Sequence, residues 1–296
     1  MIRVGPAGWS YPDWEGVVYP RAKPAGFHPL AHLLHFVDCV EINSSFYALP
    51  RAEHARRWAE IAAARPDFRF LVKLNRDFTH GPLPPPDERE RLAAAFLDGI
   101  EPLIRARKVA ALLIQFPVGF LYGPTEVRRL GTIAAPFRAL PLAVELRHDS
   151  WFAPPALATL RGLGLSLLTI DLPPAWNHPP GWHEPTGPLG YLRLHGRNSL
   201  QWFRSGAGRD DRYDYLYSPR ELAQLADKAR RLASRHDDVY VVTNNHFEGQ
   251  AVANAIELKA LLAGPGGERP SAPPELVERF PRLSEVARVE GQQRLF

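Results

Sequence analysis

Short apolar segments alternate with longer segments of helical periodicity along most of the chain. The short segments are nearly continuously apolar, which is typical of parallel strands that are buried on both faces. They lie at residues 2–8, 39–43, 68–74, 109–116, 141–146, 166–170, 191–195 and 239–243. The helical segments lie at residues 52–64, 87–105, 125–134, 154–163, 219–235 and 248–262. The pattern predicts a repeating strand–helix unit, with Thr125 and Ser218 as helix N-caps.

The number and length of these units favour an α/β fold of the TIM-like (β/α)₈ barrel type, for which about 250 residues is typical. A doubly wound parallel sheet has the same local pattern, so periodicity alone leaves it open. The sixth unit is irregular, because the prolines between residues 171 and 188 disfavour a helix. The Pro- and Gly-rich stretch after residue 262 is typical of a linker. We therefore expect a barrel domain at 1–262, and a linker with a C-terminal tail at 263–296.

Composition and charge exclude several classes of protein. Hydrophobic residues make up 45% of the chain and charged residues 23%, which excludes a wholly disordered chain. A single cysteine excludes a disulfide scaffold. Because no apolar run approaches the roughly 20 residues of a membrane-spanning helix and no signal-peptide pattern is present, we expect a cytoplasmic protein without a membrane partner. The formal net charge of +4 permits an anionic ligand without indicating a nucleic-acid-binding protein.

Polar residues gather at the carboxyl ends of the predicted strands, where barrel enzymes carry their sites. Residues two positions apart, such as Glu41 and Asn43, point to the same side of a strand. Because a charge facing the surrounding helices is costly to bury, we expect these side chains to face the barrel mouth. The candidate ligand-binding residues are Trp9, Asn43, Lys73, Arg76, Arg147, Arg193, Arg197, Asn244 and Asn245. The candidate catalytic residues are Glu41, Glu145, His148, Asp171, His195 and His246.

The acids and histidines allow two kinds of chemistry. Carboxylate and imidazole groups suit Mn, Zn or Mg, and a bound divalent metal would activate water. The predicted metal ligands are Glu145, His148, Asp171, His195 and His246. Without a metal, Glu41 and Glu145 would act as general acid and base, as in glycoside cleavage. The structural alternative is an ionic network in which arginines and Lys73 pair with the acids and lower their pKa.

The basic residues predict an anionic ligand that contains phosphate, because the guanidinium group suits bidentate contacts to phosphate oxygens. The alternative is that these cations only balance the acids at the same strand ends. Trp176, Trp182 and Trp202 lie in loops rich in Pro and Gly. Their rings are therefore candidate platforms for a base or a sugar.

Seven short motifs follow one another along the chain. They are GPAGWSYPDW (5–14), EINSSFY (41–47), FLVKLNRDFTH (70–80), LLIQFP (112–117), VELRHDSW (144–151), YLRLHGR (191–197) and VTNNH (242–246). Together they resemble the YecE-like family, domain of unknown function seventy-two. The last motif departs from the usual pattern, in which an aromatic residue precedes Asn-Asn-His, but the Asn-Asn-His is present. The resemblance implies a TIM-like barrel from about residue 4 to residue 262 and implies no reaction, since the family has no established activity.

The C-terminal tail adds a candidate partner. Gln292, Leu295 and Phe296 match the pattern QxxLF, which resembles peptides that dock on bacterial replication sliding clamps. The alternative is that Leu295 and Phe296 pack on the chain's own barrel. Three functional hypotheses stay open: a metal-dependent phosphodiester hydrolase or lyase acting on nucleic acid, for example in DNA repair; a sugar isomerase or glycosidase-like enzyme; and a non-catalytic nucleic-acid or sliding-clamp adaptor.

Overall fold

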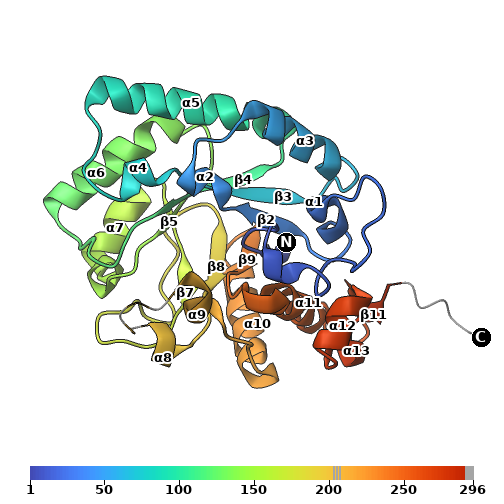
Figure 1. The fold of residues 1–296 in the computed structure, drawn as a ribbon. Coiled ribbons are helices and arrows are strands. Elements are labelled where there is room, and N and C mark those ends of the chain that lie inside the picture. The colour runs from blue at the N-terminus through green and yellow to red at the C-terminus, as the bar shows by residue number, and fades with distance from the viewer. Residues whose placement is uncertain (203, 205, 207, 291–296) are drawn as a thin grey trace, which may run out of the picture.

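The fold is mixed α/β, with two parallel sheets and helices around them (Figure 1). The computed structural model describes residues 1–202, 204, 206 and 208–290. One sheet has the strand order β2 (Cys39–Ile42), β3 (Arg69–Lys73), β4 (Val109–Gln115), β5 (Leu142–Glu145) and β6 (Ser166–Leu167). The other has the order β1 (Ile2–Pro6), β9 (Val239–Thr243), β8 (Gly190–Leu194) and β7 (Thr169–Asp171). A short separate pair consists of β10 (Ser271–Ala272) and β11 (Arg288–Val289).

Helices occupy most of the connections between the strands. The longer ones are α3 (Ala52–Ala62), α5 (Pro86–Arg105), α6 (Pro124–Ala134), α7 (Pro154–Gly162), α10 (Pro219–Ala233) and α11 (Gln250–Ala263). The shorter ones are α1 (Pro29–Leu33), α2 (Ser44–Tyr47), α4 (Arg76–Thr79), α8 (Ser199–Trp202), α9 (Arg209–Tyr213), α12 (Pro274–Arg279) and α13 (Leu283–Val286). Single 3₁₀ turns are η1 (Pro12–Trp14), η2 (Ala135–Phe137), η3 (Asp149–Phe152) and η4 (Phe247–Gly249).

The predicted helix caps have different outcomes. Ser218 caps α10 as predicted, because its side chain accepts a hydrogen bond from the backbone N–H of Glu221 in a capping box. Thr125 is not a cap, since α6 begins at Pro124 and takes Gly123 as its N-cap residue. Proline at the first helical position has no N–H to satisfy, and this favours the earlier start.

Alternate residues of the strands belong to two separate apolar cores. Val72, Leu112 and Val144 pack in the larger core, which includes the helices. Their chain neighbours Leu71 and Leu113 belong to a smaller core formed almost entirely by strand residues. Because successive side chains of a strand point to opposite faces, strands that are covered on both faces are apolar throughout. This explains the continuous apolar segments of the sequence.

The two sheets adjoin along β1 and β2. The N–H of Gly8 donates to the carbonyl oxygen of Glu41 over 2.8 Å, and the N–H of Asp38 donates to that of Val4 over 2.9 Å. A Cβ atom at Gly5 would stand 1.7 Å from the carbonyl oxygen of Cys39, so this close approach requires glycine. Elsewhere, β6 pairs with β5 and β7 pairs with β8, and only residue 168 separates β6 from β7.

The connection between β7 and β8 is the irregular one. Residues 172–189, all of which the structure describes, contain no helix and no strand. This confirms the prediction from the prolines, which fix the backbone φ angle and lack an N–H donor. The loop places Trp176 on the same side of the molecule as the carboxyl ends of the neighbouring strands, where it lines a cavity together with Arg147.

The described part of the C-terminal extension packs on α11 (Figure 1). Arg282 forms an ion pair with Glu257 of α11 and donates to the carbonyl oxygen of Tyr217 over 3.0 Å. The predicted clamp-binding residues, Gln292, Leu295 and Phe296, lie outside the described residues. Among the residues that are described, no helix is long and apolar enough to cross a membrane.

Candidate functional site

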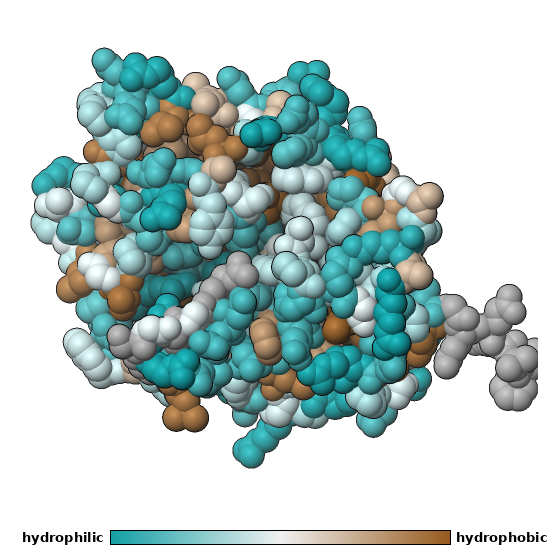
Figure 2. All heavy atoms as spheres, in the orientation of Figure 1, coloured by the Kyte–Doolittle hydropathy of each residue, from teal (hydrophilic) through white to brown (hydrophobic). Residues whose placement is uncertain are grey.

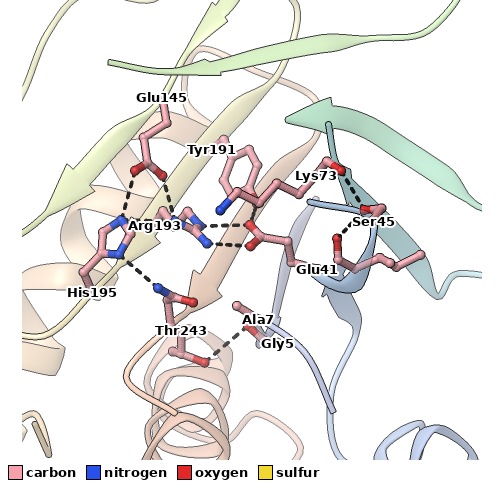
Figure 3. A network of polar contacts seen from close by, with 12 residues as sticks. Gly5, Ala7, Glu41, Ser45, Lys73, Glu145, Tyr191, Arg193, His195 and Thr243 are labelled. Carbon is pink, nitrogen blue, oxygen red and sulfur yellow. Dashed lines mark hydrogen bonds and ion pairs between the residues drawn. The ribbon is translucent and has the colours of Figure 1, made fainter. Parts of the chain in front are cut away.

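Arg193, near the end of β8, is the centre of a buried ionic network (Figure 3). Its guanidinium group donates two hydrogen bonds to Glu41, from Nε to Oε2 over 2.9 Å and from Nη2 to Oε1 over 2.6 Å. Its Nη1 donates to Oε2 of Glu145 over 2.8 Å. The hydroxyl group of Tyr191 also donates to Glu41. Since Arg193 and both carboxylates are buried, their charges are satisfied by one another rather than by water.

Glu145, the last residue of β5, is held by a second arginine. The Nε of Arg147 donates to Oε1 of Glu145 over 2.7 Å, and Nε2 of His195 lies 3.4 Å from the same oxygen. Burial by itself would raise the pKa of Glu145, but the charges of Arg147 and Arg193 hold that pKa well below its usual range. Glu145 therefore stays ionised at neutral pH and has no proton to donate.

His195 is the neutral member of this network. Burial, reinforced by the charge of Arg193, lowers the pKa of the His195 side chain to about 3. The amide Nδ2 of Asn244 lies 3.0 Å from Nδ1 of His195, and because an amide nitrogen only donates, Nδ1 is the acceptor. The ring proton then lies on Nε2, which faces Glu145. Asn244 thus fixes the ring of His195, and His195 in turn helps to orient Glu145.

Lys73, the last residue of β3, differs from the other cations. It is 8% exposed, yet within the described part of the chain its ammonium group makes no hydrogen bond or ion pair. Its Nζ lies 3.9 Å from the centre of the Phe46 ring, a cation–π distance. Burial, reinforced by the charge of Arg193, lowers the pKa of Lys73 to about 7. Figure 3 shows the side chain extending from β3 toward Arg193 and Glu41.

Three adjoining cavities open at the carboxyl ends of the strands. A narrow cavity of about 110 Å³ is lined by Tyr11, Asn43, Tyr47, Lys73, Gln115, Arg193, Tyr213, Asn244 and His246. A wide cavity of about 690 Å³ shares Gln115 with it and includes Arg147 and His80. A third, of about 470 Å³, shares Asn43 with the narrow cavity and includes Trp9. Figure 2 shows a hollow on this side of the molecule whose visible walls are mostly hydrophilic.

Asp171 and Arg197 belong to a separate network. The Nε and Nη2 of Arg197 donate to the two carboxylate oxygens of Asp171 over 2.8 and 2.7 Å. The Nη1 of Arg197 donates to Glu221 of α10 over 3.0 Å, and the hydroxyl group of Tyr217 donates to Asp171 over 2.9 Å. These contacts fasten the end of β7 to α10. The structure therefore does not bring Asp171 and Arg197 together with Glu41, Glu145 and Lys73.

Two further candidates hold the backbone in place. His148 precedes η3, and its Nδ1 accepts a hydrogen bond from the N–H of Ser150 over 3.2 Å, as an N-cap does. Asn245 points away from the cavities, because its Nδ2 donates to the carbonyl oxygen of Tyr215 over 2.8 Å and to Oδ1 of Asn254 over 2.9 Å. Both side chains therefore have structural partners.

The remaining candidates lie at the edges of the site. His246 lines the narrow cavity and stacks on Tyr11, with ring centres 4.5 Å apart. Trp9 lines the third cavity and packs edge-on against Trp58 at 5.1 Å. Arg76 is exposed at the first position of α4. Of the predicted ligand-binding residues, Asn43, Lys73, Arg193 and Asn244 share the narrow cavity.

The five predicted metal ligands do not form one cluster in the described part of the chain. No group of three or more His, Cys, Asp or Glu side chains among the described residues is arranged to hold a metal ion. The reason lies in the partners of the five predicted ligands, Glu145, His148, Asp171, His195 and His246. The two carboxylates are already neutralised by arginines in separate networks, and His148 caps a 3₁₀ turn.

The sequence as a whole now identifies the family. Residues 3–276 match the model described as protein of unknown function DUF72. The chain belongs to the DUF72 family. This confirms the resemblance of its motifs to the YecE-like family. The UPF0759 protein YunF of Bacillus subtilis (strain 168) is 29% identical to this DUF72 chain over 274 residues, which cover 88% of the chain and 95% of YunF. The UPF0759 protein YecE of Escherichia coli (strain K12) is 32% identical over 158 residues, which cover 52% of the chain and 51% of YecE.

Solved structures of DUF72 proteins are similar over most of their length. A DUF72 family protein from Enterococcus faecalis V583 matches with a TM-score of 0.77 and 28% identity, covering 88% of this chain and 95% of that one. One from Thermotoga maritima MSB8 matches with a TM-score of 0.74 and 32% identity, covering 88% and 99%. These names state a family and no reaction, so the function of this DUF72 chain has to be argued from its site.

Tyr191 and Tyr213 belong to the site and are not among the candidate residues of the sequence analysis. Tyr191 binds Glu41 and lies two positions before Arg193 on β8, so strand alternation places both on one face. That spacing is a signal that is available from the sequence. Tyr213 lies in the short helix α9 and lines the narrow cavity. Nothing in the strand pattern connects α9 with the site.

Proposed function

We propose that the DUF72 chain binds a small ligand with a negatively charged group, and that Lys73 is the side chain that meets this charge. One observation carries the proposal. Of the two Lys and Arg residues that line the narrow cavity, Arg193 is paired with Glu41 and Glu145, whereas the ammonium group of Lys73 makes no hydrogen bond or ion pair within the described residues. A buried cation that has no ion-pair partner favours the binding of an anion.

The charges around the narrow cavity support the same proposal. Lys73, Arg147 and Arg193 stand against the carboxylates of Glu41 and Glu145, with His195 neutral. When Lys73 is protonated, this group carries one positive charge in excess. A ligand with one negative group balances it, and phosphate is the anion that the sequence analysis favours. For phosphodiester chemistry at this site, Lys73 would offset the charge that develops on the phosphate oxygens.

The sugar-enzyme alternative is less well supported by the geometry. Glycoside cleavage needs one carboxyl group that holds a proton. Glu145 is ionised, because Arg147 and Arg193 keep its pKa low despite burial. Glu41 accepts hydrogen bonds from Arg193 and Tyr191, so both of its carboxylate oxygens already have donors. An acid–base pair of carboxylates therefore does not fit this network.

Phosphate binding tests the proposal directly. We expect inorganic phosphate to bind the full chain at pH 6 in isothermal titration calorimetry, and Lys73→Met to abolish binding because it removes the excess charge. Arg76→Met is the matched control, since it removes a positive charge three residues away from an exposed position. Absence of binding by the wild-type chain, or equal losses in the two variants, would overturn the proposal.

The pKa of Lys73 favours a second candidate. At a pKa of about 7 a large fraction of the amine is neutral at physiological pH, which suits nucleophilic attack on a carbonyl carbon. The amine nitrogen would bond to that carbon, and the carbonyl oxygen would leave as water, giving an imine. Borohydride reduction in the presence of pyruvate, a carbonyl compound with a negative group, would then add a stable mass to the wild-type chain and none to Lys73→Met. Absence of the adduct counts against this candidate.

We also propose that the two sheets form one TIM-like (β/α)₈ barrel at 1–262, followed by the extension at 263–296. The backbone hydrogen bonds between β1 and β2 support it on one side. The short separation of β6 from β7 supports it on the other, because one continuous strand would then pair with both β5 and β8. In such a barrel Lys73 of β3, Glu145 of β5 and Arg193 of β8 lie at the carboxyl ends of their strands, at the mouth. Truncation after residue 262 tests this boundary. If the boundary is right, the shorter chain still unfolds in one cooperative transition.

A further inference from the structure

We infer that the wide cavity beside Lys73 receives a flat apolar ring of the same ligand, stacked on Trp176. The ligand is then an aromatic ring that carries a phosphate or a similar anionic group. This inference rests on the proposed anion site, since it assigns the second half of the ligand that Lys73 binds. Trp176 differs in its surroundings from the buried tryptophans Trp14 and Trp151.

Trp176 is 89% exposed, although tryptophan is normally buried over most of its surface. Trp14 and Trp151 show the usual arrangement: both are fully buried, and each indole N–H donates to a carbonyl oxygen, of His246 over 2.8 Å and of Phe120 over 2.7 Å. An exposed indole ring beside a cavity has its face available for a planar partner.

Trp182 was the other tryptophan predicted in this loop as a platform, and its ring already has a partner. The guanidinium carbon of Arg231 lies 3.7 Å from the centre of the Trp182 ring, and the ring packs against the larger core. Trp182 does not line the wide cavity. The contrast assigns the role of a ligand platform to Trp176 rather than to Trp182.

The wide cavity is lined by both apolar and polar side chains. Its apolar walls are Pro117, Val118, Leu172, Ala175 and Trp202, together with Trp176. Its polar walls include His80, Gln115 and Arg147. Because Gln115 also lines the narrow cavity, the two cavities adjoin at this residue, and Lys73 lines the narrow one. A volume of about 690 Å³ lies within the range of small-molecule pockets.

Trp202 connects the two parts of the site. Its ring centre lies 6.0 Å from that of His195 and 5.6 Å from that of Tyr213, which lines the narrow cavity. The apolar walls therefore begin directly beside the buried network. A ligand whose anionic group is attached to a ring by one bond fits this arrangement, since the charge and the ring would occupy adjoining spaces.

The experiment compares inorganic phosphate with phenyl phosphate by isothermal titration calorimetry on the full chain. We expect phenyl phosphate to bind the wild-type chain more tightly than inorganic phosphate does. Trp176→Ala should weaken phenyl phosphate by about tenfold, the size expected for loss of one aromatic stack, and leave inorganic phosphate unchanged. Trp176→Phe should keep most of the affinity, because it retains a stacking face. Leu200→Ala is the matched control, since Leu200 is 85% exposed and does not line the cavity.

The outcomes separate this inference from the proposal beneath it. Equal affinity of the wild-type chain for the two ligands, or an equal effect of Trp176→Ala on both, would overturn the inference while the anion site stands. Failure of both ligands to bind would overturn the anion site itself. Lys73→Met, measured alongside, should abolish binding of both ligands, which distinguishes the site of the charge from the site of the ring.

Discussion

Two arginine networks lie at the carboxyl ends of the strands, one around Arg193 of β8 and one around Arg197 just after β8, and they differ in how their charges balance. Around Arg193 three cations meet two carboxylates, those of Glu41 and Glu145. Around Arg197 there are also two carboxylates, those of Asp171 and Glu221. Lys228 lines the same cavity as Arg197, so two cations balance these two carboxylates. The first network has a charge left for a ligand, and the second does not.

The two networks also differ in what they connect. Arg197 links Asp171 of β7 to Glu221 of α10, and its side chain is 27% exposed, so it has a structural role at the edge of the site. Arg193 is 2% exposed and holds two carboxylates from different strands under the narrow cavity. Residues of the same types, at the same ends of strands, thus form a structural link around Arg197 and a candidate binding site around Arg193.

The largest expected effect is on the stability of the first network. Glu41→Ala removes the bidentate partner of Arg193 and leaves a buried guanidinium group with Glu145 alone. Removal of one partner from a buried ion pair costs about 3–5 kcal/mol of unfolding free energy. Urea denaturation followed by circular dichroism measures this loss.

The matched substitution in the second network is Asp171→Ala. Because Arg197 is partly exposed and keeps Glu221, we expect a loss of about 1.5 kcal/mol, the size of charged hydrogen bonds that solvent partly replaces. Equal losses in Glu41→Ala and Asp171→Ala would show that the two networks are energetically alike, and the comparison between them would fail.

The second expected effect is a gain of stability. Lys73→Met should raise the unfolding free energy by up to about 5 kcal/mol at pH 6, because it removes a charge that is buried without an ion pair and each unit by which burial lowers the pKa corresponds to about 1.4 kcal/mol. The ordinary pKa of lysine is 10.5, and in the folded chain that of Lys73 is about 7. Between these values the unfolded chain holds a proton that the folded chain lacks, so wild-type stability rises with pH through this window.

The advantage of Lys73→Met should therefore shrink as pH rises from 7 to 10.5. Urea denaturation of both proteins across this range measures the difference, in which titration of all other groups cancels. Arg76→Met, at an exposed position, serves as the control and should show little change at any pH. A gain that is constant with pH would mean that Lys73 is protonated throughout in the folded chain.

The alternation of apolar and helical segments was enough to predict the parallel α/β fold and the irregular connection before β8. Both follow from local rules, the burial of both strand faces and the geometry of proline. The sequence also placed Glu41, Lys73, Glu145 and Arg193 at strand ends, and the structure brings them together. What the pattern lacked was the pairing between them, because whether an arginine is free or bound to a carboxylate depends on contacts across strands far apart in the chain.

The metal prediction shows the same limit. Glu145 and Asp171 are each the last residue of a strand, yet Arg193 and Arg147 bind the first and Arg197 binds the second. Residue types alone did not distinguish a carboxylate that is available to a metal ion from one that is already neutralised. Tyr213 was missed for a related reason, since it comes from α9 and not from a strand.

The last expected effect, on the pH dependence of sulfate binding, is the most specific test of Lys73. Sulfate keeps a constant charge between pH 6 and 9, so any change in its affinity reports on the protein. Because only the protonated form of Lys73 attracts the anion, the affinity should be constant below pH 7 and fall about tenfold per pH unit above it, about 1.4 kcal/mol for each unit. Lys73→Arg keeps its charge throughout this range, so sulfate should bind it without the pH dependence. A fall of equal size in Lys73→Arg would assign the titration to another group and remove Lys73 from the anion site.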